Sequence, residues 1–326
     1  MNKLSRRTFV NMAAGAAALP AASRIARAQA YPTRPVRIIV GYAAAGGTDI
    51  TARLIGRWLS ERLGQQFIVE NRPGANSNIA TGAVVRAPAE GYTLLLVSAA
   101  CAINATLYDK LNFNFIRDIA PVASIIRDPH VMAVHPSIPA KTVPEFIAYA
   151  KANPGKINMA SAGSGSTSHV SGELFKMMTG VNLVHVPYRG AGPALVDLLA
   201  GVVQVYFSPT PPAIEYIKAR KLRTLAVTTA LRSEALPDIP TVGEFVPGYE
   251  ASGWSGIGSP KSTPTEVIDK LNREINTALA DPKFKARLAD LGSVPMPMSA
   301  ADFGKLIAES VDKWGNVIQA LNIKAD

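Results

Sequence analysis

The chain has 326 residues, and its 34 Lys and Arg residues against 24 Asp and Glu residues give a formal net charge of +10. Half of this excess lies in the first 30 residues, and the rest of the chain has no run of Lys or Arg, which argues against a nucleic-acid partner. The single cysteine, Cys101, excludes an intrachain disulfide, and the length beyond residue 30 suggests one large domain or two ordinary ones.

Residues 1–30 are predicted to be a cleaved export signal. Basic residues precede a short apolar stretch at residues 10–19, which is too short to span a bilayer, and Ala28–Ala30 form a small-x-small cleavage pattern. The segment Ser5–Phe9 contains an Arg pair followed by Thr and Phe, which favours a twin-arginine signal over an ordinary secretion signal. We therefore expect an exported protein.

Beyond the signal, short β-branched runs alternate with segments whose apolar residues recur every three or four positions. Alternation of strands and helices implies parallel sheets that are covered by helices on both faces, an α/β architecture. The predicted strands are residues 36–40, 67–70, 93–98, 157–161, 183–186, 203–207 and 222–228.

The last quarter of the chain is predicted to be helical. Thr263-Pro264 and Asp281-Pro282 each begin a segment with apolar residues on one face, and Ser299 is expected to cap a third helix. Their apolar stripes are typical of helices that cover a core.

The stretch GYAAAGGTD, residues 41–49, follows the first predicted strand and nearly fits a phosphate-binding loop, but Gly47 stands where that pattern has its lysine. Gly46 and Gly47 let the backbone approach a ligand closely, and Thr48 or Asp49 is expected to cap the helix that follows. Without a cation, the loop is a poor nucleotide site.

A second stretch of the same kind, residues 161–169, follows another predicted strand. It is rich in Gly and Ser, and a helix is expected to begin near Thr167 or Ser168. A helix start carries unpaired N–H groups and a partial positive charge, so it can hold an anion without a cationic side chain. Of the four histidines, His169 alone is placed to touch a ligand there. One loop of this composition is explained by a plain turn, but two such loops in the same chain predict a ligand site.

Signs of catalysis are few. Neither AGSGSTS at residues 162–168 nor SGWSGIG at residues 252–258 contains the Gly-x-Ser-x-Gly pattern of a nucleophile elbow. The histidines lack metal-ligand spacing, so no metal or cofactor is expected. An exported hydrolase that uses Ser164 or Ser166 remains an alternative, although no orienting carboxylate is evident.

Four long stretches of the sequence resemble those of a known protein family. They include VENRPGA at residues 69–75 and HVPYRG at residues 185–190. From about Pro35 to the C-terminus the chain resembles the solute-binding receptors of tripartite tricarboxylate transporters, called Bug or TctC receptors. The resemblance implies a periplasmic, non-enzymatic receptor that captures a small organic carboxylate and delivers it to membrane permease subunits, as a monomer. A receptor that senses its ligand for signalling is the second alternative.

The fold implied by the resemblance is a two-lobed periplasmic binding protein of type II, in which each lobe is a mixed, mostly parallel sheet flanked by helices and the ligand cleft lies between the lobes. Residues 31–130 and 250–326 are expected to build lobe one and residues 131–249 lobe two. The chain is expected to cross between lobes near residues 127–135 and 249–256.

The site implied by the resemblance consists of the two loops, which hold the carboxylate with backbone amides and hydroxyls, and a few wall residues. Tyr42 stands where the family often has Phe, and Ser208 lies in a segment that departs from the family pattern, so the identity of the ligand does not carry over. Arg189 is a possible cationic contact. The expected ligand-binding residues are Tyr42, Ala45, Gly46, Gly47, Thr48, Asp49, Ser161, Ala162, Gly163, Ser164, Gly165, Ser166, Thr167, Ser168, His169, Tyr188, Ser208 and Trp254.

Overall fold

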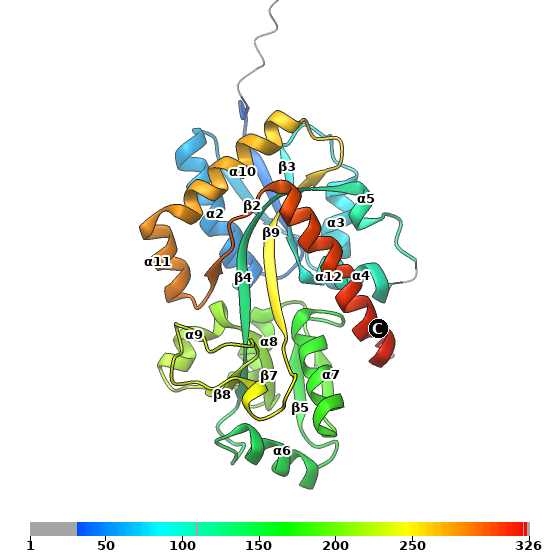
Figure 1. Ribbon diagram of the computed structural model, residues 1–326, viewed down its shortest axis with the longest axis vertical. Coiled ribbons are helices and arrows are strands. Elements are labelled where there is room, and N and C mark those ends of the chain that lie inside the picture. The colour runs from blue at the N-terminus through cyan, green and yellow to red at the C-terminus, as the bar shows by residue number, and fades with distance from the viewer. Residues whose placement is uncertain (1–30, 109, 322, 325–326) are drawn as a thin grey trace, which may run out of the picture.

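The computed structural model describes residues 31–108, 110–321 and 323–324, so the predicted export signal lies outside the described residues. Figure 1 shows an elongated molecule with an upper and a lower part, each a layer of strands with helices on both sides. Two long strands, β4 (Ile119–Val134) and β9 (Ser252–Pro260), run along the axis that connects the parts. The protein is an α/β fold built on a curled mixed sheet.

The strands of the upper part are ordered β2-β1-β3-β9-β4, and those of the lower part continue the same sheet as β4-β7-β5-β6. Two further strands, β8 and β10, also pair with β4. The bounds of these strands are β1 Val36–Val40, β2 Phe67–Asn71, β3 Thr93–Ser98, β5 Asn158–Ser161, β6 Val184–Pro187, β7 Val205–Pro209, β8 Arg223–Val227 and β10 Val294–Pro295. All seven strands predicted from the sequence are present.

The parallel ladders join β1 to β2 and β3 in the upper part and β5 to β6 and β7 in the lower part. Every described pairing of β4 and β9 is antiparallel. The sheet is therefore mixed, as expected, with antiparallel pairs concentrated around β4 and β9. The two linking strands run in opposite directions, because one passes from the upper to the lower part and the other returns.

Helices cover both faces of both parts. Their bounds are α2 Gly47–Leu63, α3 Asn78–Val85, α4 Ala99–Leu107, α5 Phe115–Asp118, α6 Val143–Ala152, α7 Thr167–Thr179, α8 Ala191–Leu199, α9 Thr210–Lys218, α10 Thr265–Ala280, α11 Pro282–Asp290 and α12 Ala300–Leu321, with short 3₁₀ turns at Ala75–Ser77 and Val242–Glu244. The three predicted C-terminal helices are present. The Ser299 hydroxyl accepts the Asp302 N–H at 3.0 Å, which confirms the predicted cap of α12.

Alternate residues along the strands enter different cores. In β3, Leu94 and Leu96 pack with α2 and α10, whereas Leu95 and Val97 pack towards α3, α4 and α12. In β7, Tyr206 likewise enters a different core from its neighbours in the strand. Because side chains alternate across a strand, these near-continuous apolar runs are what a sheet covered on both faces requires.

The strands β4 and β9 contain the segments that were expected to cross between lobes, and Figure 1 shows both of them passing from the upper to the lower part. The residue boundaries between the two lobes remain a prediction. After β9 the chain returns to the upper part, where α10 packs on α2 and β4, and α12 packs on α4 and β4. The C-terminal half of α12 also contacts α7 of the lower part, and its Trp314 and Ile318 join the core of that part.

Gly256, in β9, provides a test of this packing. A Cβ atom there would lie 2.5 Å from the Ala123 carbonyl oxygen of β4 and 2.4 Å from the Phe303 ring of α12. We expect Gly256→Ala to lower the free energy of unfolding by about 3 kcal/mol, because overpacking against backbone cannot relax easily. Urea denaturation measures this loss.

The matched control is Gly64→Ala at the end of α2. Gly64 has a φ of 70° and no atom within 4 Å of its Cβ position. This substitution should cost only the strain of a left-handed residue, about 1 kcal/mol. Equal losses in the two variants would contradict the packing described for β4, β9 and α12.

Candidate functional site

The first loop connects β1 to α2. The helix begins at Gly47 with Gly46 as its N-cap, so the expectation that Thr48 or Asp49 caps the helix is wrong. Asp49 instead lies in the first turn and is buried. Its Oδ2 accepts the Ala45 N–H at 2.9 Å and its Oδ1 accepts the Asn71 side-chain amide at 3.0 Å. These bonds hold the loop in its shape and hold Ala45 at a φ of 64°.

The second loop connects β5 to α7, and the helix begins at Thr167, as predicted. Ser166 is the N-cap, and its hydroxyl accepts the His169 N–H at 3.3 Å. The Ser168 hydroxyl accepts the Ala162 N–H at 2.9 Å. Side-chain oxygens thus tie the loop to the first turn of the helix, which satisfies donors that would otherwise lack partners.

His169 is part of this support and does not line the cavity described below. Its Nδ1 accepts the Gly165 N–H at 3.0 Å, and its ring stacks on His185 with centroids 3.8 Å apart. On its other side, Nε2 lies 3.7 Å from Glu173. Burial of Glu173 acts against ionisation, but hydrogen bonds from His169 and Lys176 lower its pKa to about 2, so a fixed negative charge faces the imidazole.

A Ser–His contact does exist, but it is buried. The Ser161 hydroxyl and His185 Nε2 are 2.7 Å apart, and the same hydroxyl accepts the Gly163 N–H. Ser161 has no exposed surface, and it lines neither of the two cavities described below. This pair therefore has the spacing of a nucleophilic site without access to a substrate.

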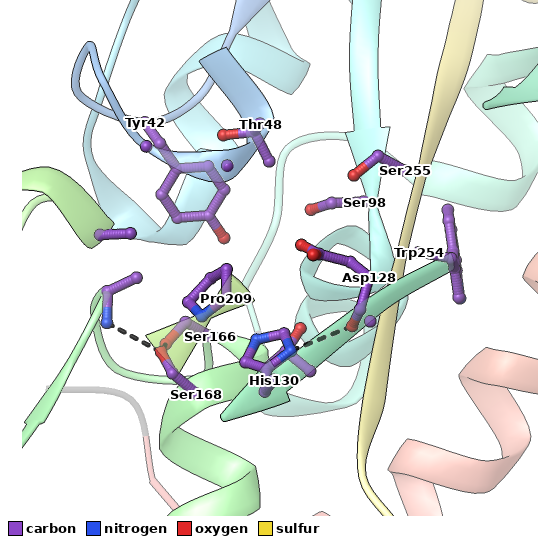
Figure 2. A pocket seen from close by; sticks show the side chains of 16 residues that line it. Tyr42, Thr48, Ser98, Asp128, His130, Ser166, Ser168, Pro209, Trp254 and Ser255 are labelled. Atoms are coloured by element: carbon purple, nitrogen blue, oxygen red, sulfur yellow. Dashed lines mark hydrogen bonds between the residues drawn. The ribbon is translucent and has the colours of Figure 1, made fainter. Parts of the chain in front are cut away.

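The main cavity lies between the starts of α2 and α7 and encloses about 470 Å³ including its open mouth. Figure 2 shows Thr48 and Tyr42 on one side of it and Ser166 and Ser168 on the other, with Ser98, Asp128 and His130 between them. Nine of the expected ligand-binding residues line it, namely Tyr42, Gly46, Gly47, Thr48, Ala162, Ser166, Thr167, Ser168 and Trp254. Among the described residues that line this cavity, none is Lys or Arg.

A side cavity of about 620 Å³ shares Tyr42 and Ala162 with the main one. Three more of the expected residues, Gly163, Ser164 and Tyr188, line this side cavity together with Arg189. The Tyr188 hydroxyl donates to Asp197 at 2.6 Å, and burial together with this bond raises the pKa of Tyr188 to about 12. The phenol of Tyr188 is therefore held by the protein and stays neutral.

The other six expected residues line neither cavity; they are Ala45, Asp49, Ser161, Gly165, His169 and Ser208. Ser208 illustrates the reason, since successive residues of a strand point to opposite faces and Pro209, the next residue of β7, lines the main cavity instead. Gly165 packs against the upper part, where a Cβ atom would lie 2.0 Å from Leu107 Cδ2.

Tyr42 and Trp254 are wall residues whose polar atoms bind elsewhere. The Tyr42 hydroxyl donates to Asn76 Oδ1 at 2.7 Å, and Asn76 in turn donates to Asn104. Trp254 Nε1 donates to Ser310 at 2.9 Å, and its ring packs edge-on against Phe303. Both side chains therefore offer the cavity an aromatic surface in a fixed orientation.

The two parts of the molecule touch beside the cavity. The Ala43 N–H, in the first loop, donates to the Arg189 carbonyl oxygen at 3.1 Å. Gly190 and Gly192 permit this approach, since Cβ atoms there would lie 3.0 Å from Ala43 N and 2.9 Å from the Ala44 carbonyl oxygen. In the described structure the cavity is therefore bounded by both parts.

The family of the chain is identified by its similarity to known proteins. Residues 51–323 match the model of the tripartite tricarboxylate transporter family receptor, TctC. The chain belongs to this family. It is 35% identical over 300 residues to the protein BugT of Bordetella pertussis, which covers 91% of this chain and 92% of BugT. The family consists of periplasmic solute-binding receptors, a class without catalytic activity.

Solved structures agree with the assignment. The structure of Rpa4515 of R. palustris with adipate matches with a TM-score of 0.89 and 36% identity, covering 91% of this chain and all of that one. MatC of Rhodopseudomonas palustris with bound malate matches with a TM-score of 0.84 and 31% identity, covering 88% of this chain and all of that one. The fold is therefore that of a TctC periplasmic binding protein.

In this TctC receptor, the linking strands and adjacent loops bring to the main cavity seven residues that were not predicted from the sequence, namely Ser98, Asp128, His130, Ala191, Pro209, Gly253 and Ser255. The sequence does carry a signal for two of them. Asp128 and His130 are polar residues on either side of a proline in β4, which is otherwise largely apolar. Residues of this kind in a buried strand indicate a functional position.

Both residues are buried, and Asp128 lacks a partner for one of its carboxylate oxygens. Asp128 is 6% exposed, its Oδ1 has no hydrogen-bond partner among the described residues, and burial raises its pKa to about 7. His130 Nδ1 donates to the Asp128 carbonyl oxygen at 3.1 Å, and burial lowers the pKa of His130 to about 4, so its ring is neutral at pH 7.

The described residues contain no cluster of His, Cys, Asp and Glu that could hold a metal ion. None of the helices they form has the length and apolar character needed to cross a bilayer.

The raised pKa of Asp128 predicts a pH-dependent cost of folding. The folded protein holds the proton more tightly than the unfolded chain, where the pKa is near 3.8. The stability that this group contributes is therefore fully present below about pH 4 and lost as the pH rises through 7, a loss of about 4 kcal/mol. Asp128→Asn should match the wild type at pH 4 and exceed it at pH 8, as measured by urea unfolding without ligand.

His130 acts in the opposite sense, because its lowered pKa removes stability as the pH falls through 6.5 towards 4. It is present in both proteins, so it cancels from their difference. Asp269→Asn, which removes an exposed carboxylate from α10, is the matched control and should leave the difference near zero at every pH. A difference between Asp128→Asn and wild type that does not change with pH would contradict the burial of an unpaired carboxylate.

Proposed function

We propose that this protein is the exported receptor of a tripartite tricarboxylate-type transporter, that it captures a small organic carboxylate by closing two lobes around it, and that it delivers the solute to membrane permease subunits. The observation that carries this proposal is the pair of helix starts, those of α2 and α7, on opposite sides of one cavity. Each offers N–H groups that have no partner inside its helix.

The ligand carboxylate is bound at a helix start and by hydroxyls, without a cationic side chain. Thr48 and Ser166 each place a hydroxyl at the cavity from opposite sides. The partial positive charge of each helix terminus stabilises an anion. Because no lysine or arginine is committed to the anion, binding and release both remain possible at modest energetic cost. The adipate and malate bound in the two similar receptors support a small organic carboxylate as the ligand.

Contacts between the two parts support the proposed lobe closure. The first loop and the loop that precedes α8 meet through Ala43 and Arg189, and Gly165 meets Leu107. Residues 31–130 with 250–326 and residues 131–249 are the proposed lobes, with β4 and β9 as the connection about which they move. The proposed receptor works as a monomer and needs no cofactor, and a cleaved signal at residues 1–30, of the twin-arginine type, exports it to the periplasm.

A thermal-shift screen of the purified protein against small carboxylates tests the proposal. A ligand at about a hundred times its dissociation constant adds roughly 2.7 kcal/mol to the free energy of unfolding, which raises Tm by several degrees. The expected result is a rise in Tm with at least one carboxylate. A rise with a solute that lacks a carboxylate, and with no carboxylate in the panel, would overturn the proposal.

Gly165→Ala tests lobe closure. The added Cβ would lie 2.0 Å from Leu107 Cδ2 and 3.0 Å from Asn76 Nδ2, so the second loop could not approach the upper part as closely. We expect the affinity for the best carboxylate of the screen to fall at least about tenfold in isothermal titration calorimetry, since a displaced loop misplaces the donors that it presents.

Gly180→Ala, at the other end of α7, controls for backbone strain. Its φ of 70° is close to the 76° of Gly165, and no atom lies within 4 Å of its Cβ position. Only Gly165→Ala should lose affinity for the carboxylate. Unchanged affinity in both variants would argue against closure at this contact.

A further inference from the structure

Asp128 is a buried carboxylate that faces the ligand cavity of a receptor proposed to bind carboxylates. It comes from the middle of β4 and lies between the two helix starts in Figure 2. Its side chain is more than nine-tenths buried, and its Oδ1 has no hydrogen-bond partner among the described residues. A buried polar group without a partner is costly, so its retention at the centre of a cavity calls for a ligand group that completes it.

No Lys or Arg is among the described residues that line the cavity around Asp128. On its own strand, Arg127 lies on the opposite face and lines a different cavity. Across the ladder, Asp128 pairs with Gly253 of β9, which has no side chain to offer. From α2, the Cβ position of Gly47 lies 3.5 Å from Asp128 Oδ2.

His130 adds a second acceptor. A carbonyl oxygen can only accept, so the bond to the Asp128 carbonyl fixes the proton of His130 on Nδ1. In the neutral ring Nε2 is then an acceptor, on a side chain that lines the same cavity. Asp128 and His130 therefore place acceptors beside the start of α2, whereas the start of α7, on the opposite side, has no carboxylate among the described residues that line the cavity.

We infer that the receptor selects carboxylates that also carry a protonated amine, the chemistry of amino acids, with the ammonium group paired to Asp128 and the carboxylate held at the start of α7. An ammonium supplies three donors to acceptors that lack them. A second carboxylate at the same place would meet the charge of Asp128 at close range. The inference rests on the proposed function and specifies the ligand class of that site.

The test measures affinity in matched pairs that differ only at the amine. L-alanine is compared with L-lactate, β-alanine with succinate, and γ-aminobutyrate with glutarate, and the remaining α-amino acids are compared with their α-hydroxy analogues. Isothermal titration calorimetry at pH 8 is carried out on the wild type, on Asp128→Asn, which keeps the shape and removes the charge, and on Asp269→Asn as the control for an exposed carboxylate.

In the expected result, the ligands that bind the wild type carry an amine and bind at least about tenfold more tightly than their amine-free partners. Asp128→Asn should lose about 30-fold or more of that affinity, since removal of one member of a buried charge pair leaves the other unpaired. The same variant should bind the amine-free partners as well as the wild type does or better. Asp269→Asn should behave as the wild type.

Two results would overturn the inference and leave the proposed function intact. One is tighter binding of amine-free carboxylates by the wild type. The other is equal affinity for amino acids in Asp128→Asn and the wild type. Failure of every carboxylate, with or without an amine, would count against the proposed function itself and remove the inference with it.

Discussion

The antiparallel pairing of β4 with β9 is the constraint on which the rest of the structure depends. Its register places Asp128 opposite Gly253 and Pro129 opposite Ser252, at the level where the two parts of the molecule meet. Just beyond this point β4 pairs with β7 and β8 instead. The strand β4 is therefore hydrogen-bonded in both parts, so the residues that it brings to the cavity are held in place relative to each part.

In the two loops that precede α2 and α7, the side chains and the backbone have different roles. In the first loop Asp49 bonds to Ala45 and Asn71, and in the second Ser168 bonds to Ala162. These polar side chains fix the shape of the loops at the starts of α2 and α7, and residues of both helix starts line the cavity. A rigid array of donors loses little entropy when a ligand binds, which is the advantage of preorganisation.

Much of the fold and part of the site could be predicted from the sequence. Strands such as β1 and β3 are compact apolar runs, and the start of α7 follows from its Ser-rich turn. The strand β9 was harder to predict because its sequence, SGWSGIGSP, has Gly and Ser at most positions. Glycine is poor in strands, and here Gly256 is required by the close approach of Phe303.

The site was predicted less completely for a geometric reason. Sequence reasoning identifies loops rich in donors, but it cannot tell which of two adjacent residues of a strand faces a cavity, and so Ser208 was expected where Pro209 lies. Nor can it bring Asp128, a residue of a strand with an apolar pattern, next to Gly47, which is eighty-one positions earlier in the chain. Both facts depend on register and on the pairing of distant segments.

The contact between Ala43 and Arg189 has a consequence for how long a solute stays bound. A single backbone hydrogen bond contributes a net stabilisation of only about 1 kcal/mol, so it cannot by itself keep two lobes together for long. In the proposed receptor a solute that bridges the two sides adds to the contacts between the parts and so stabilises the closed form. Residence time is then a property of the cargo as much as of the protein, and a solute that fails to reach both sides departs quickly.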